Sequence, residues 1–137
     1  MLREEGLPAV FSRHSRFAEA TRQAVRAWGL DLVCADPARF SSSMTAVMMP
    51  AGFDSDALRR VILERFDMSL GTGLGKLKGV SFRVGHLGDF NDLMLAATLS
   101  GIEMGLALAG VPFMPGGVAR ALAALTAENR TTAAPSR

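Results

Sequence analysis

Apolar residues recur at helical spacing in four stretches of the chain. The first stretch runs from Pro8 to Trp28 and ends before Gly29, with arginine, glutamate and glutamine between its apolar positions. The longest apolar stretch carries leucine or isoleucine at i, i+4, i+7 and i+11, all on one helix face. The pattern therefore predicts four helices, over residues 8–28, 54–65, about 92–110 (with a cap at 89, 91 or 92) and 118–127.

Shorter runs of β-branched and other apolar residues predict strands between these helices. The expected strands cover residues 30–33, 44–49, 68–70 and 80–84. The order becomes helix, strand, strand, helix, strand, strand, helix, helix. Such an order is typical of an α+β fold, in which a small, mostly antiparallel sheet is covered by helices.

Two glycines lie one turn apart in the long helix, Gly101 and Gly105. Because glycine has no side chain, this spacing predicts that another segment packs closely against the helix there. The preceding helix is expected to begin at Asp54, since aspartate side chains cap helix N-termini.

Composition supports one domain with a hydrophobic core. Of 137 residues, 49% are hydrophobic and 20% are charged, and the net charge is only +2, which offers little attraction for nucleic acid. The apolar stretch from Leu93 to Phe113 contains Glu103, glycines and a proline, so we expect a buried helix and no membrane span. A single cysteine, Cys34, excludes an internal disulfide and favours a reducing cytoplasm.

A glycine-rich segment that leads into a strand with one arginine is the strongest candidate for a functional site. Residues 71–85 contain this segment, and Arg83 is the arginine. A guanidinium among apolar residues is costly to desolvate unless it meets an anion, and it binds carboxylates through two parallel hydrogen bonds. Two interpretations remain open at this point: a clamp for a small carboxylic acid, or a structural salt bridge to Asp67 or Asp89.

Phosphate-binding motifs do not account for the glycine segment. A P-loop requires Ser or Thr after its lysine, whereas Leu77 follows Lys76. The dinucleotide-binding pattern fails as well, because Lys76 occupies the position of its third glycine. Without a functional role, the segment would be a flexible hairpin turn.

The two histidines do not predict a metal site, because no cysteine lies near either of them. We expect His14 to pack on the apolar side of the first helix. His86 follows the strand of Arg83, and it either packs in the interior or faces the same site.

The first helix carries four arginines without an aromatic stacking platform, so nucleic-acid binding is not expected. A solvated or subunit-facing helix side explains them better. These residues are Arg13, Arg16, Arg22 and Arg26. Cys34, between Val33 and Ala35 and without an evident base, is expected to be a buried small hydrophobe.

Three stretches carry a family resemblance that covers essentially the whole chain. The most specific is Phe-Arg-Val-Gly-His-Leu-Gly at residues 82–88, and the others lie at residues 66–76 and 99–107. These stretches resemble the C-terminal part of serine–glyoxylate aminotransferases, which are class V, fold-type I pyridoxal-phosphate enzymes.

The resemblance implies that Arg83 receives the α-carboxylate of an amino- or oxo-acid substrate. Gly71, Gly73 and His86 would then lie at the edge of the same pocket. The expected segments are a linking helix over 1–29, a small C-terminal α+β domain over 30–127 and a flexible tail over 128–137.

The resemblance also implies pyridoxal 5'-phosphate, but this chain lacks the parts that would hold it. Its two lysines, Lys76 and Lys78, lie in the predicted hairpin loop, whereas a Schiff base needs a desolvated amine aimed at the cofactor. We therefore expect no catalytic residue here and no covalent cofactor on this chain alone. A large domain is expected to supply the lysine.

Two hypotheses follow for the whole chain. In the first, it is the small domain of a serine–glyoxylate-type aminotransferase, which binds a small amino or oxo acid together with a large pyridoxal-phosphate domain and forms a homo-oligomer. In the second, it is a non-catalytic, stand-alone binding or assembly module derived from such an enzyme.

Overall fold

The protein is described by a computed structural model that covers residues 2–132. Within this range the elements in chain order are α1 (Leu2–Glu5), α2 (Leu7–Ala27), the 3₁₀ helix η1 (Pro37–Arg39), β1 (Met44–Met48), α3 (Ser55–Phe66), β2 (Gly71–Thr72), the 3₁₀ helix η2 (Gly75–Leu77), β3 (Ser81–Gly85), α4 (Asp92–Leu108) and α5 (Gly117–Thr132). The predicted α+β class with a small antiparallel sheet is confirmed. No helix in residues 2–132 has the length and apolar character needed to cross a membrane.

Strand β3 lies at the centre of the sheet, between β1 and β2. Both pairings are antiparallel, and their register places Ala46 on one side of Arg83 and Gly71 on the other. The ladder continues past the end of β3, where the amide of His86 donates to the carbonyl of Ser43 at 3.0 Å. Arg83 therefore sits mid-sheet, flanked by the two smallest residue types.

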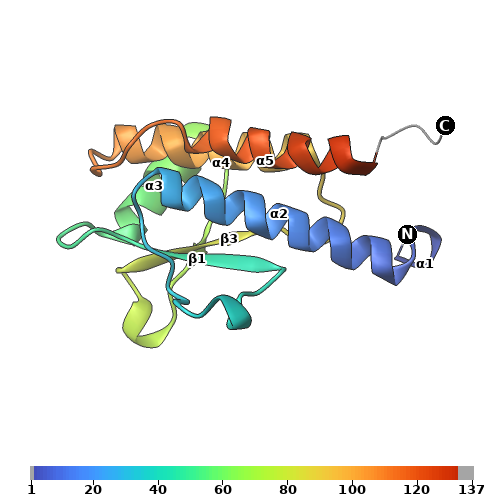
Figure 1. The fold of residues 1–137 in the computed structure, drawn as a ribbon. Helices are drawn as coiled ribbons and strands as arrows, with labels where there is room; N and C mark the ends of the chain where they lie inside the picture. Colours follow the sequence, from blue (N-terminus) through green and yellow to red (C-terminus); the bar gives the residue numbers. More distant parts are fainter. Residues whose placement is uncertain (1, 133–137) are drawn as a thin grey trace.

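The two faces of the sheet have different surroundings. Val47, Phe82 and Val84 alternate along their strands, are fully buried, and face the helices, as the period of two in a strand requires. The helices lie on that side of the sheet, whereas the turns η1 and η2 lie on the other (Figure 1). The face that carries Arg83 is thus free of helices.

Two of the predicted strands are wrong in position. Residues 30–33 form only an isolated bridge between Leu32 and Val47, because the segment diverges from β1 after a few hydrogen bonds. Residues 68–70 are not a strand, and the pairing begins instead at Gly71–Thr72. The glycine segment is therefore partly an edge strand, stabilised by β3 despite its low strand propensity.

The helix boundaries predicted from the sequence agree with those in the structure in most places. Asp54 and Asn91 are the N-caps of α3 and α4, and their side chains accept hydrogen bonds from Asp56 and Met94 amides. Helix α5 continues past its predicted end at residue 127. The predicted tail, 128–137, thus begins within this helix, and residues 133–137 lie outside the described part.

The arginines of α2 hold other segments of the same chain. Three of them bind across the fold: Arg13 to the carbonyl of Gly88 at 2.7 Å, Arg16 to the carboxylate of Asp92 at 2.6 Å, and Arg22 to the carbonyl of Ser41 at 3.3 Å. The expectation of a solvated or subunit-facing side is therefore wrong for these three. Long apolar stems let arginines reach carbonyls that loops leave unpaired.

The glycine pair of α4 admits helix α3, as predicted. A side chain at Gly105 would meet Ile62 at 2.3 Å, and one at Gly101 would meet Met68 at 2.7 Å. Both distances are shorter than van der Waals contact. The absence of side chains at these two positions allows α3 and the segment that follows it to pack closely against α4.

The carboxylate of Glu103 joins three helices. It accepts hydrogen bonds from the indole of Trp28 at 2.7 Å and from the amides of Gly116 and Val118 at 2.9 and 3.0 Å. Partial burial on its own would raise the pKa of Glu103. The hydrogen bonds outweigh this effect and hold the pKa below its ordinary value of 4.5.

We expect Glu103→Ala to lower the free energy of unfolding by about 3 kcal/mol, because it leaves three donors without their charged acceptor. Since the folded pKa of Glu103 is lowered, its contribution is complete above pH 4.5 and is lost as the pH falls toward the folded value. Urea denaturation of Glu103→Ala at pH 7 measures the effect. Glu64→Gln, at an exposed position of α3, is the matched control, and equal losses in both variants would contradict this role.

Candidate functional site

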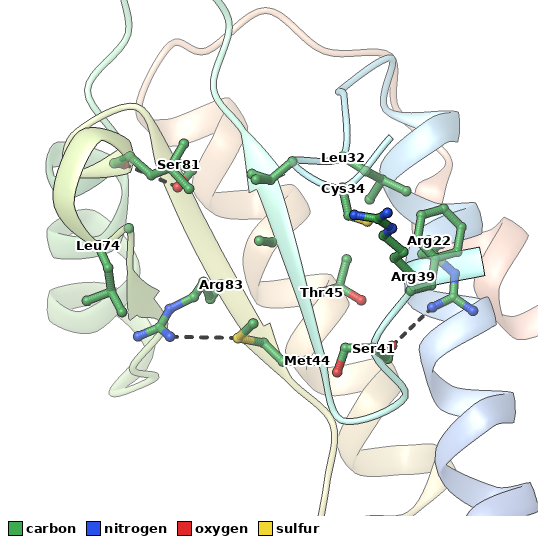
Figure 2. Close-up of a pocket in the computed structure, with 15 residues that line it drawn as sticks. Arg22, Leu32, Cys34, Arg39, Ser41, Met44, Thr45, Leu74, Ser81 and Arg83 are labelled. Atoms are coloured by element: carbon green, nitrogen blue, oxygen red, sulfur yellow. Dashed lines mark hydrogen bonds between the residues drawn. The ribbon is translucent and has the colours of Figure 1, made fainter. Parts of the chain in front are cut away.

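A cavity of about 370 Å³ opens on the helix-free face of the sheet (Figure 2). One wall is the segment 32–34 with residues 39–41 of the following turn, and the opposite wall is the glycine segment at residues 73–77. The floor is formed by β1 and β3, including Met44, Ala46 and Arg83. The cavity therefore lies where the sequence places its candidate site.

The guanidinium of Arg83 is held from one side and open on the other. Its Nε donates to the carbonyl of Thr72 at 2.8 Å, and its Nη1 approaches the sulfur of Met44 at 3.8 Å. In Figure 2 the guanidinium lies between Leu74 and Met44, over the face of the sheet. Among the described residues Arg83 has no salt bridge, so neither Asp67 nor Asp89 plays that part.

Two further arginines line the same cavity, and both are already paired. Arg22 binds Glu19 at 3.1 Å and lies over the ring of Phe40 at 4.7 Å. Arg39 binds Asp36 at 3.3 Å. Sequence patterns did not single out Arg39 as part of a site. Of the three, Arg83 alone lacks a carboxylate partner within residues 2–132, so it is best suited to bind an anionic ligand.

The glycines of the segment have structural roles. At Gly71 a Cβ would lie 3.0 Å from Cβ of Arg83 and 3.2 Å from its Nε, so a larger residue there would push against the arginine where it crosses the edge strand. At Gly73 a Cβ would lie 2.0 Å from the carbonyl oxygen of Leu77, which is backbone and cannot move aside. Gly73 lines the cavity, whereas Gly71 does not.

His86 is buried below the cavity and does not line it. Its Nε2 lies 2.9 Å from the hydroxyl of Thr45, which does line the cavity, and its Nδ1 has no partner among the described residues. Burial lowers the pKa of His86 to about 4, and the charge of Arg22 adds to the effect. The imidazole is therefore neutral at physiological pH.

His14 lies outside the lining of the cavity, whereas Cys34 is part of it. His14 accepts the amide of Gly88 at Nε2 (3.0 Å), which leaves Nδ1 to donate to the carbonyl of Val10 (2.7 Å). Cys34 is half-buried in the cavity wall, so the expectation of a buried thiol is wrong. No cluster of three or more metal-binding side chains occurs in the described part of the chain.

The described residues do not fit a covalent pyridoxal-phosphate site. Lys76 and Lys78 are exposed on the turn η2 and neither lines the cavity, so no amine faces the place where a ligand would sit. Within residues 2–132, no α-helix begins in the lining of the cavity, where its N-terminus could bind a phosphate.

The small antiparallel sheet and its helices match the fold of the small domain of solved aminotransferases. The fold superposes with a TM-score of 0.86 on pyridoxamine–pyruvate aminotransferase from Mesorhizobium loti, at 33% identity over 92% of this chain and 33% of that one. Ureidoglycine–glyoxylate aminotransferase from Bacillus subtilis gives a TM-score of 0.85 at 27% identity, over 91% of this chain and 33% of that one.

Sequence comparison leads to the same group of proteins. L-aspartate–glyoxylate aminotransferase of Paracoccus denitrificans is 45% identical over 85% of this chain, and serine–glyoxylate aminotransferase of Methylorubrum extorquens is 41% identical over 92%. The chain spans only 30% and 31% of these two relatives. No family model matches the sequence. The chain belongs with the small C-terminal domains of the class V aminotransferases, as its motifs indicate.

The lowered pKa of His86 predicts that stability falls between pH 7 and pH 5. An unfolded histidine takes up its proton near pH 6.5, whereas the buried one resists until about pH 4, so acid favours the unfolded state in this window. We expect a loss of about 2 kcal/mol at pH 5. Urea denaturation of the wild type and His86→Gln at both pH values measures it, and equal pH dependence in the two proteins would contradict the assignment.

Proposed function

We propose that this chain provides the substrate-carboxylate site of a pyridoxal-phosphate-dependent glyoxylate aminotransferase, with Arg83 as the residue that binds the α-carboxylate. The observation that carries the proposal is the Nη edge of Arg83 at the floor of the cavity, which has no oxygen acceptor among the described residues and only the sulfur of Met44 at 3.8 Å from Nη1. The relatives named above include aminotransferases for serine and for aspartate with glyoxylate, which supports a small amino or oxo acid as the ligand.

Arg83 would act by orienting the acid. Two parallel hydrogen bonds from its Nη atoms fix the plane of a carboxylate and neutralise its charge. Met44, Ala46 and Leu74 supply apolar wall around that position, which excludes water and strengthens the ion pair. The rest of the acid then projects away from the sheet, toward the part of the enzyme that covers this face.

The remainder of the enzyme would cover that face. In this proposal a large domain contributes the lysine that this chain lacks and holds pyridoxal phosphate, and α2 links the two domains. The assembled enzyme is a cytoplasmic homo-oligomer. The alternative, a stand-alone module without chemistry, receives no support from the comparisons.

The proposal predicts that Arg83→Ala raises the KM for glyoxylate about a hundredfold, because a desolvated carboxylate loses its only described cationic partner. Arg83→Lys retains the charge without the planar fork and should cost about tenfold. The assay is transamination of serine with glyoxylate by a chimera, in which this chain replaces the small domain of the Methylorubrum extorquens relative.

Arg39→Ala is the matched control for this experiment. It removes an arginine from the same cavity, but one whose side chain is 83% exposed and paired with Asp36. Its KM for glyoxylate should stay within about twofold of the parent value. Full activity of Arg83→Ala, or equal losses in both variants, would refute the role of Arg83.

A further inference from the structure

Arg83 is oriented through a single strong hydrogen bond, from its Nε to the carbonyl of Thr72 at 2.8 Å. That bond occupies the side of the guanidinium that would otherwise grip a carboxylate through Nε and Nη2. The opposite, end-on edge is free except for the long contact of Nη1 with the sulfur of Met44. The position of the Thr72 carbonyl therefore decides where the free edge of Arg83 points.

Thr72 belongs to β2, which is only two residues long. Such a short edge strand has few ladder hydrogen bonds of its own. Helix α3 supplies additional ones: Arg59 Nε donates to the carbonyl of Leu70 at 2.8 Å, and Oδ1 of Asp56 lies 3.2 Å from the hydroxyl of Thr72, where it shares the single hydroxyl proton with the carbonyl of Gly73, also at 3.2 Å.

Asp56 and Arg59 also fix each other, one turn apart on α3. Arg59 Nη1 binds the same carboxylate oxygen, Oδ1 of Asp56, that accepts the Thr72 hydroxyl, at 2.8 Å. Their side chains are 31% and 27% exposed, so the pair contributes little to global stability. Its geometric effect falls on β2, where it holds residues on both sides of Gly71.

We propose that Asp56 and Arg59 are positioning residues for Arg83, which hold β2 so that Arg83 presents its Nη1 and Nη2 atoms end-on to the carboxylate of a small acid. The carboxylate part of this inference rests on the proposed function, whereas the orientation of Arg83 does not. Neither Asp56 nor Arg59 lines the cavity, so they act only through Thr72 and Leu70.

The orientation is tested without ligand by hydrogen exchange of the Arg83 Nε–H, followed by NMR on the 137-residue chain. The expected result is slow exchange in the wild type and about tenfold faster exchange in Arg59→Met, which keeps an unbranched helix-forming side chain but removes both hydrogen bonds to Leu70 and Asp56. Arg60→Met is the control, because Arg60 is the next residue of α3 and is exposed.

Thr72→Val and Thr72→Ser provide a second test that does not alter the charge of α3. Valine removes the hydroxyl bond to Asp56 and keeps the shape and the main-chain carbonyl, so exchange of the Arg83 Nε–H should speed up about threefold. Serine keeps the hydroxyl and should restore the slow exchange. If side-chain volume were the cause, exchange would instead be faster in Thr72→Ser than in Thr72→Val, because valine matches the volume of threonine more closely than serine does.

Glyoxylate titration of the same samples tests the consequence for binding. The dissociation constant should rise about tenfold in Arg59→Met and stay within about twofold of the wild type in Arg60→Met. Equal exchange rates and equal affinities in Arg59→Met, Arg60→Met and the wild type would overturn the positioning role. If exchange responds as expected but the wild type does not bind glyoxylate, the proposed function fails and the orientation of Arg83 stands.

Discussion

The fold depends on a carboxylate that satisfies three donors from two ends of the chain. Glu103 on α4 accepts the indole of Trp28 at the end of α2 and the amides that begin α5. Gly117 lies against the same indole, closer than any side chain would allow. Because α2, α4 and α5 meet at this point, they brace the helices α2 and α3, which cover one face of a three-stranded sheet that could not stand alone.

Because the helices cover one face of the sheet, the cavity lies on the other face. The central strand β3 buries Phe82 and Val84 under the helices and turns Arg83 to the opposite side, so a single strand contributes both core and site. The turns η1 and η2 then border the cavity, and the arginines of α2 hold the loops around it. The cavity is thus lined by loops and strands. The α-helices support these segments, and Arg22 is the α-helical residue that lines the cavity.

The sequence predicts the helices well and the edges of the sheet poorly. Periodicity, caps and the glycine pair of α4 are local signals, and the structure confirms them. The strand β2 is not local, because Gly71–Thr72 is extended only through its pairing with β3 and its bonds to α3. For the same reason the hydrogen-bond partner of Arg83 could not be identified from the sequence. Thr72 accepts the bond through its main-chain carbonyl, which every residue type has.

The close fit of Arg83 over Gly71 has a thermodynamic consequence. A free arginine side chain has many rotamers, and restricting them during binding would weaken the affinity for a small ligand. Here the crossing over a bare glycine backbone and the bond to Thr72 restrict them during folding. A small ligand at Arg83 would therefore meet a side chain that is already ordered, and its affinity would not be lowered by the conformational entropy of that arginine.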